Sequence, residues 1–241
     1  MTTQGAEERG QGAEHEGFVG VVFDLDGVLV ESEHLWEEHW TSYAAGQGYA
    51  WQPSDTVRVQ GMSVPEWSGY MAERIGRGTA AEIAEVVIDG MIGALNGGRV
   101  ALLPGASGMV EAAAARAPVG VASSAPKRLI EATLAATGLR PFFDAVVSSE
   151  EVPRGKPSPD VYREAARRLG LDPLGCVGVE DSSNGIRAAA AAGLTVVAIP
   201  NPVYPPKPDA LALCAMIAAS PAEVRGFLEA RLPARAVGAA G

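Results

Sequence analysis

The stretch that decides the fold is Val19–Val28, which reads VGVVFDLDGV. Five almost uninterrupted apolar residues run into two carboxylates, Asp24 and Asp26, and Gly27 follows at once. An apolar run of this kind, rich in valine and ended by a glycine, is typical of a buried strand in a parallel sheet. Burying Asp24 at the end of such a strand is costly unless its charge is compensated. The stretch therefore predicts a polar crevice that holds a cation at the carboxyl end of this strand.

Downstream of residue 103, apolar segments alternate with segments of helical periodicity. Four further strands are predicted, at residues 118–122, 145–147, 176–179 and 195–199. The helices that precede them are predicted at residues 107–116, 127–137, 158–169 and 185–192. Strands that alternate with helices of about 10 to 15 residues are typical of right-handed crossovers in a parallel sheet. We therefore predict an α/β fold with a doubly wound, Rossmann-like parallel-sheet core.

Residues 32–102 interrupt this alternation. They show apolar residues at helical spacing, capping boxes that begin at Ser63 and Thr79, and no convincing strand. We predict that they form a small all-helical cap domain inserted after the first strand. The expected division is a disordered leader (1–17), an α/β core (18–31 and 103–230), the helical cap domain (32–102) and a flexible tail (231–241).

The composition argues against several classes of partner. The 241 residues carry a formal net charge of −10, and 47% of them are hydrophobic. A chain of this length can bury a full core, but a nucleic acid or an anionic membrane would require a basic surface. Cys176 and Cys214 are the only cysteines and lack metal-binding spacing. We expect a cytoplasmic protein, a monomer or weak dimer, with no nucleic-acid or membrane partner.

In open α/β sheets, ligands bind beyond the carboxyl ends of the strands. Side chains with chemical function at the ends of the predicted strands are therefore candidates for a binding site. In chain order these are Asp24, Asp26, Ser123, Ser124, Lys156, Glu180 and Asp181. Carboxylates, hydroxyls and one lysine are thus expected to converge on a single site.

This set of side chains suits phosphoryl transfer. Asp24, Glu180 and Asp181 offer the hard oxygen ligands that Mg²⁺ prefers. Lys156 can hold a phosphoryl oxygen and reduce the repulsion between an anionic substrate and Asp24. With that charge neutralised, Asp24 can attack phosphorus and form an aspartyl-phosphate. Asp26 can then protonate the leaving oxygen, provided that burial raises its pKa.

Further hydrogen-bond donors for the phosphoryl group are available nearby. The Ser123 hydroxyl and the backbone N–H groups of Leu25 and Asp26 can point at the same oxygens. Leu25 and Ser124, which adjoin the charged residues, are therefore predicted to bind substrate.

Four separated motifs resemble those of the haloacid dehalogenase (HAD) superfamily, in the branch with a small helical cap. They are DLDGV (24–28), VASS (121–124), GKPSPD (155–160) and VEDSSNG (179–185), and the resemblance covers about residues 18–225. It implies that Asp24 is the nucleophile, Asp26 the general acid and base, and Ser123 a phosphate ligand. It also implies Mg²⁺ held by the Asp24 carboxylate, the Asp26 backbone carbonyl and Asp181, with Glu180 beside it.

Residue differences within the family separate its activities. Dehalogenases lack the second Asp because a halide leaving group needs no proton, so Asp26 argues against that chemistry. Phosphonoacetaldehyde hydrolases require a cap lysine, and residues 32–103 contain none. The remaining activities are a phosphatase of small phosphorylated metabolites, such as sugar phosphates, and a β-phosphoglucomutase-like transfer between sugar hydroxyls.

Two cap residues bear on that choice. The mutases carry a histidine where this chain has Trp36, and a Trp there is more similar to the sugar-phosphate phosphatases. Arg58, in the segment RVQGMS (58–63), is similar to the mutase arginine that binds the distal phosphate. We predict a phosphatase with Trp36 and Arg58 as candidate substrate ligands, and keep the mutase as the alternative. An inactive HAD-like binding module is less favoured because all four motifs are intact.

Overall fold

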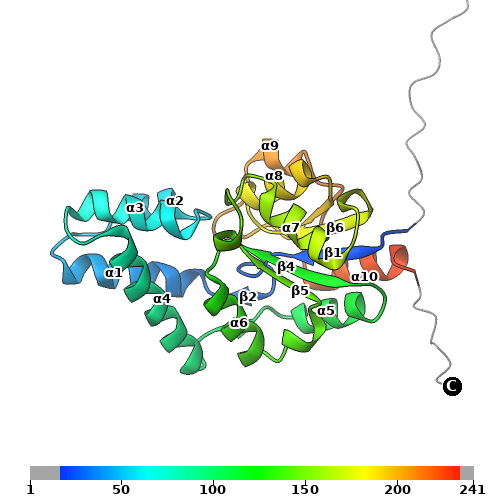
Figure 1. Ribbon diagram of the computed structural model, residues 1–241, viewed down its shortest axis with the longest axis horizontal. Coiled ribbons are helices and arrows are strands. Elements are labelled where there is room, and N and C mark those ends of the chain that lie inside the picture. The colour runs from blue at the N-terminus through cyan, green and yellow to red at the C-terminus, as the bar shows by residue number, and fades with distance from the viewer. Residues whose placement is uncertain (1–16, 234–241) are drawn as a thin grey trace, which may run out of the picture.

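The computed structural model describes residues 17–233 and contains a six-stranded parallel sheet (Figure 1). Its strands are β1 Gly20–Phe23, β4 Val119–Ser123, β5 Ala145–Ser148, β6 Cys176–Glu180, β7 Thr195–Ala198 and β8 Met216–Ile217. They lie in the order β5-β4-β1-β6-β7-β8. β1 pairs in parallel with β4 on one side and β6 on the other. The predicted parallel α/β core is confirmed.

Helices cover both faces of this sheet (Figure 1). One face carries α5 Ala106–Ala114, α6 Lys127–Ala136 and α10 Pro221–Arg231, and the other carries α7 Asp160–Leu169, α8 Ser183–Ala192 and α9 Pro208–Leu211. Alternate residues of β1 point to opposite faces of the sheet. Val21 and Phe23 pack in the hydrophobic cluster with α5, α6 and α10, and Val22 packs in the cluster with α7, α8 and α9. Burial on both faces explains why β1 reads as a continuous apolar run.

Some elements are absent from the prediction. These are the edge strand β8, the helices α9 and α10, and the 3₁₀ segments η1 Arg140–Phe142, η2 Ser149–Glu151 and η3 Pro173–Gly175. Except for α10, these segments have only two to four residues, which is too short to show a periodic pattern. The predicted leader and tail fall almost entirely on residues 1–16 and 234–241, which lie outside the described residues.

Between β1 and β4 the chain forms a helical insertion. It leaves the core through β2 Val30–Glu31 and returns through β3 Ala101–Leu102, and these two strands pair antiparallel. The four helices between them are α1 Glu33–Gly46, α2 Pro53–Val59, α3 Val64–Ile75 and α4 Ala80–Asn96. Capping boxes begin α3 at Ser63 and α4 at Thr79, as their sequences predict. The β2–β3 ribbon was not predicted.

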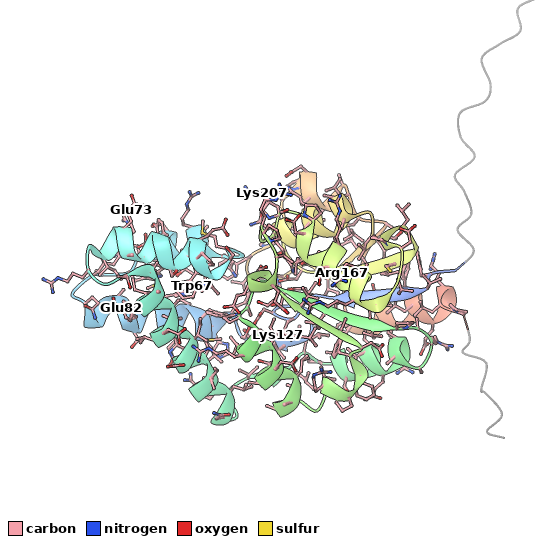
Figure 2. The ribbon with its side chains drawn as sticks, viewed as in Figure 1. Trp67, Glu73, Glu82, Lys127, Arg167 and Lys207 are labelled. Carbon is pink, nitrogen blue, oxygen red and sulfur yellow. The ribbon has the colours of Figure 1, made fainter. Side chains whose placement is uncertain are left out.

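The insertion has a hydrophobic cluster of its own, centred on Trp40, Trp67 and Met71. Trp67 lies among the insertion helices, whereas Glu73 and Glu82 lie at their outer surface (Figure 2). On the side of α6, Arg128 donates hydrogen bonds to two acidic residues of α4. None of the described helices is long and apolar enough to cross a membrane.

Candidate active site

Asp24 follows β1 at the carboxyl edge of the sheet. Its backbone N–H donates to Val179 of the neighbouring strand β6 (2.9 Å), which fixes where the side chain emerges. The Asp24 side chain is buried, with 7% of the residue exposed. Its Oδ1 accepts a hydrogen bond from Lys156 Nζ at 2.7 Å. The structure therefore places Lys156 in direct contact with the Asp24 carboxylate.

Lys156 is buried between two carboxylates. Its Nζ also donates to Glu180 Oε1 at 2.6 Å, and the Tyr162 hydroxyl donates to the same oxygen at 2.8 Å. Burial lowers the pKa of Lys156, but Asp24 and Glu180 outweigh this effect and hold the pKa above its usual value. Lys156 thus stays protonated although its side chain is buried. Tyr162 was not predicted; it lies in α7, just beyond the motif that contains Lys156.

Glu180 uses its second oxygen to organise the loop that follows β6. Glu180 Oε2 accepts hydrogen bonds from the backbone N–H groups of Asp181 (3.0 Å) and Ser182 (3.2 Å) and from the Ser182 hydroxyl (3.1 Å). A Cβ at Gly185 would lie 1.7 Å from Glu180 Oε1, so only glycine fits there. Both carboxylate oxygens of Glu180 are therefore already hydrogen-bonded within the protein.

Three carboxylates surround this single lysine. Asp24, Glu180 and Asp181 can each offer an oxygen within 4.8 Å of the others. Burial raises the pKa of Asp24 to about 7, helped by Glu180 and Asp26 and opposed by Lys156. Burial, followed by Glu180 and Asp24, also raises the pKa of Asp181. Because one ammonium cannot balance three buried carboxylates, the site has the negative charge and the hard oxygen donors that suit Mg²⁺.

A tight turn brings the first motif against Asp181. Gly27 has φ +79°, a left-handed conformation that favours glycine, and its N–H donates to Val30 O (2.9 Å). A Cβ on Gly27 would lie 2.1 Å from Asp181 Oδ2. The absence of a side chain at Gly27 therefore lets the Asp181 carboxylate approach the turn between Asp24 and β2.

Asp26 points into the same cavity but has different neighbours. It is half-buried and accepts a hydrogen bond from the Ser32 hydroxyl. Burial raises the pKa of Asp26, although the neighbouring Ser32 and Trp36 side chains oppose the shift. A carboxyl group that holds its proton nearer to neutral pH is suited to general acid catalysis.

The remaining predicted core residues lie at the same edge. Ser123 ends β4, and its hydroxyl accepts the Ala125 N–H at 3.0 Å. Ser124 lines the cavity beside it. Leu25 as a whole is 1% exposed and packs into the hydrophobic core. Its assignment as a substrate ligand stays a prediction.

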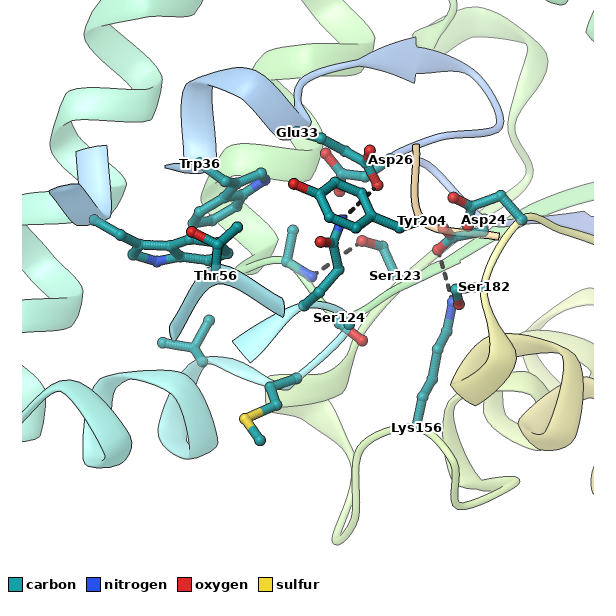
Figure 3. Close-up of a pocket in the computed structure, with 17 residues that line it drawn as sticks. Asp24, Asp26, Glu33, Trp36, Thr56, Ser123, Ser124, Lys156, Ser182 and Tyr204 are labelled. Carbon is teal, nitrogen blue, oxygen red and sulfur yellow. Dashed lines mark hydrogen bonds and ion pairs between the residues drawn. The ribbon is translucent and has the colours of Figure 1, made fainter. Parts of the chain in front are cut away.

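One cavity joins the charged residues to the helical insertion (Figure 3). The sheet side contributes Asp24, Asp26, Ser123, Ser124, Lys156 and Asp181. The insertion contributes Glu33, Trp36, Trp40, Thr56, Gln60 and Met62 among others, and Tyr204 joins from the loop between β7 and α9. Trp36 thus lines the cavity, and its role as a substrate ligand stays a prediction. Glu33, Gln60 and Tyr204 were missed because no local pattern indicates a contact between distant segments.

The structure places Arg58 outside this cavity. Its side chain is exposed on α2 and lines a neighbouring hollow, together with Arg187 and Lys207. The buried residues of α2 are Asp55, Thr56 and Val59, whereas Arg58 lies on the exposed part of the helix. The hollow beside Arg58 shares Gln60, Gly61, Met62, Ser182 and Tyr204 with the cavity. The assignment of Arg58 as a substrate ligand stays a prediction.

The fold and the cavity together define the haloacid dehalogenase class of hydrolases. The family model for haloacid dehalogenase-like hydrolases matches residues 18–193, and the chain belongs to this family. Hexitol phosphatase B of Escherichia coli is 35% identical over 190 residues, covering 76% of this chain and 84% of the relative. Fructose-1-phosphate phosphatase YqaB of the same species is 30% identical over 190 residues, covering 76% and 97%.

The fold of this chain also matches a solved structure. The structure of CbbY from Rhodobacter sphaeroides in complex with phosphate superposes with a TM-score of 0.75 at 26% identity. It covers 86% of this chain and 96% of that chain. The helical insertion and the sheet core are thus matched together over most of the molecule.

Proposed function

We propose that the protein is a Mg²⁺-dependent phosphatase that hydrolyses small phosphorylated metabolites, such as sugar phosphates, through an aspartyl-phosphate on Asp24. The observation that carries this proposal is the contact of Asp24 with Lys156 in a buried cavity that Asp26 and Asp181 also line. The named phosphatases among the relatives support the same reaction.

In this proposal each residue of the site has a separate role in the reaction. Lys156 keeps its charge and binds a phosphoryl oxygen, while the N–H groups near Leu25 and the Ser123 hydroxyl orient the others. Asp24 attacks phosphorus from the opposite side to the leaving oxygen. Asp26 donates its proton to that oxygen and later accepts one from the water that hydrolyses the aspartyl-phosphate.

Asp24, Asp181 and the backbone carbonyl of Asp26 would hold the Mg²⁺. When bound, the ion neutralises negative charge on the phosphoryl oxygens and on the carboxylates. We assign Glu180 chiefly to holding Lys156 and the loop that carries Asp181, because both of its oxygens already accept hydrogen bonds.

The first test is hydrolysis of p-nitrophenyl phosphate by the purified chain. We expect turnover with Mg²⁺ and its loss with EDTA, and we expect Mg²⁺ to raise the melting temperature because it binds only the folded site. A folded sample with no turnover in Mg²⁺ would favour the inactive binding module. Supplying β-glucose 1-phosphate with a bisphosphate primer tests the mutase alternative: free phosphate is expected, and glucose 6-phosphate as main product would contradict the phosphatase.

Asp26→Asn tests the proton donor. We expect kcat for a sugar phosphate to fall by about 10²–10⁴-fold, because an amide cannot protonate the leaving alkoxide. The loss with p-nitrophenyl phosphate is expected to be smaller, since nitrophenolate leaves without a proton. Full turnover of the sugar phosphate would remove Asp26 from this role, whereas equal losses with both substrates would place its main contribution in the hydrolysis of the aspartyl-phosphate, which the two substrates share.

A cytoplasmic location and a monomeric or weakly dimeric state remain part of the proposal. The free thiols of Cys176 and Cys214 are in keeping with a reducing compartment. The oligomeric state is open to measurement by light scattering.

A further inference from the structure

Tyr204 lines the cavity although it lies outside the four motifs. It comes from the loop between β7 and α9 of the core. Figure 3 shows its ring beside Asp26, with the phenol hydroxyl on the side of Trp36 and Glu33. In the proposed reaction Asp26 protonates the leaving oxygen. Tyr204 is therefore placed where the alcohol part of a substrate extends from that oxygen toward the insertion.

The backbone around Tyr204 is constrained. The segment IPNPVYPPKP (199–208) contains five prolines, each of which restricts the chain. Asn201 is 9% exposed, and its Oδ1 accepts the N–H groups of Tyr204 (3.0 Å) and of the residue before it (2.8 Å), which forms an Asx turn. The Lys207 N–H donates to the Ser183 hydroxyl (2.8 Å) and attaches the end of the loop to α8. The loop thus holds Tyr204 in position before a ligand binds.

The Tyr204 hydroxyl is free to bind a ligand. Within residues 17–233 it makes no hydrogen bond, although the backbone N–H of the same residue does. The oxygen is not among the fully buried polar atoms that lack a partner, so it remains accessible from the cavity that its side chain lines. A ligand can therefore bond this hydroxyl without displacing a bond within the protein.

The surroundings keep this hydroxyl protonated. Burial raises the pKa of Tyr204, and the carboxylates of Glu37 and Glu33 on α1 raise it further. The phenol is therefore a hydrogen-bond donor, and Glu33 offers an acceptor in the same cavity. A substrate hydroxyl both accepts and donates, so it can accept from Tyr204 and donate to Glu33. An apolar leaving group can do neither.

We propose that Tyr204 is a specificity residue whose hydroxyl donates a hydrogen bond to a hydroxyl of the substrate's alcohol part. This inference rests on the proposed phosphatase function and adds to it a residue from a loop that none of the four motifs contains. The competing role is structural: a hydrogen bond from Tyr204 to Glu33 or Glu37 would hold the insertion against the core. The two roles predict different kinetics.

Tyr204→Phe removes the hydroxyl and keeps the ring. The probes are phenyl phosphate, whose leaving group has no further hydroxyl, and the fastest of glucose 6-phosphate, fructose 1-phosphate and fructose 6-phosphate. We expect kcat/KM for the sugar phosphate to fall about three- to tenfold, as for the loss of one hydrogen bond. The value for phenyl phosphate should stay within about twofold, because the reacting groups are untouched. The melting temperature should not fall, since the hydroxyl makes no bond within the protein.

Tyr43→Phe is the matched control. Tyr43 is half-buried on α1, packs against the hydrophobic cluster of the insertion and lies outside the cavity. The same chemical change there is expected to leave kcat/KM unchanged with both probes. A second measurement is competitive inhibition by inorganic phosphate, which resembles only the phosphoryl part of the substrate. Its inhibition constant should agree within about twofold between the wild type and Tyr204→Phe.

The structural role predicts an equal loss with both probes and weaker inhibition by phosphate, and either result would overturn the inference. An unchanged kcat/KM for the sugar phosphate in Tyr204→Phe would also overturn it. If the wild type hydrolyses phenyl phosphate but none of the three sugar phosphates, the inference fails and the phosphatase stands. If the wild type with Mg²⁺ hydrolyses neither phenyl phosphate nor p-nitrophenyl phosphate, the proposed function itself fails.

Discussion

Replacing Asp24 with asparagine is expected to reduce phosphate release by at least about 10⁴-fold. The amide has nearly the same size and can still accept the Lys156 hydrogen bond, but it cannot attack phosphorus. The fold should persist, because the substitution removes a buried charge whose pKa burial already raises to about 7. Phosphate release under saturating Mg²⁺, with circular dichroism as the check on folding, measures both effects.

Asp209→Asn is the matched control for this substitution. Asp209 is exposed and pairs with Arg187 on the surface, so the same chemical change there should leave the rate within about twofold, as is usual for surface positions. An Asp24→Asn variant that keeps more than about a tenth of the wild-type rate would exclude an aspartyl-phosphate on this residue.

The second large effect is expected from Lys156→Met, which should lower both activity and stability. Methionine fills a similar volume but leaves Asp24 and Glu180 buried without their cation. Breaking a buried ion pair from one side costs about 3–5 kcal/mol, and losing one such charged contact to the phosphoryl group costs about 10²–10³-fold in kcat. Urea unfolding with EDTA and phosphate release with Mg²⁺ measure the two losses separately.

The stability loss in Lys156→Met has a defined pH dependence. The folded-state pKa of Lys156 is raised, so its contribution is fully present at neutral pH. Its partner Asp24 is protonated below its folded pKa of about 7, so the cost of removing the lysine should be smaller at pH 5 than at pH 8. Lys207→Met, at an exposed lysine, should show neither loss. A Lys156→Met variant as stable as the wild type at pH 8 would contradict this description of the site.

Much of the core could be predicted because its signals are local. Each buried strand is a short apolar run, and the carboxyl ends of parallel strands meet at one edge of the sheet. Asp24, Ser123 and Glu180 stand at such ends, so their convergence follows from the topology. The position of Lys156 was harder to predict, because this residue lies in a loop and not directly at the end of a strand.

The insertion side of the cavity could not be predicted in the same way. Glu33, Gln60 and Tyr204 are far apart in the chain, and their contacts depend on how the helices dock against the core. Arg58 shows the same difficulty, because its resemblance to a mutase residue does not determine how α2 is rotated and hence where the Arg58 side chain lies. The β2–β3 ribbon could not be predicted because strands of two residues are too short to show an alternating pattern.

The position of β1 inside the sheet has a consequence for how the protein is made. Asp24 and Lys156 are 132 residues apart, and β1 pairs with β4 and β6, which are synthesised much later. A nascent chain that has not yet reached Lys156 therefore contains β1 and Asp24 but lacks both β6 and the lysine that balances the Asp24 charge. Pairings so distant in sequence form slowly and leave apolar strands exposed meanwhile. The active centre is thus among the last parts of the molecule to become stable during translation.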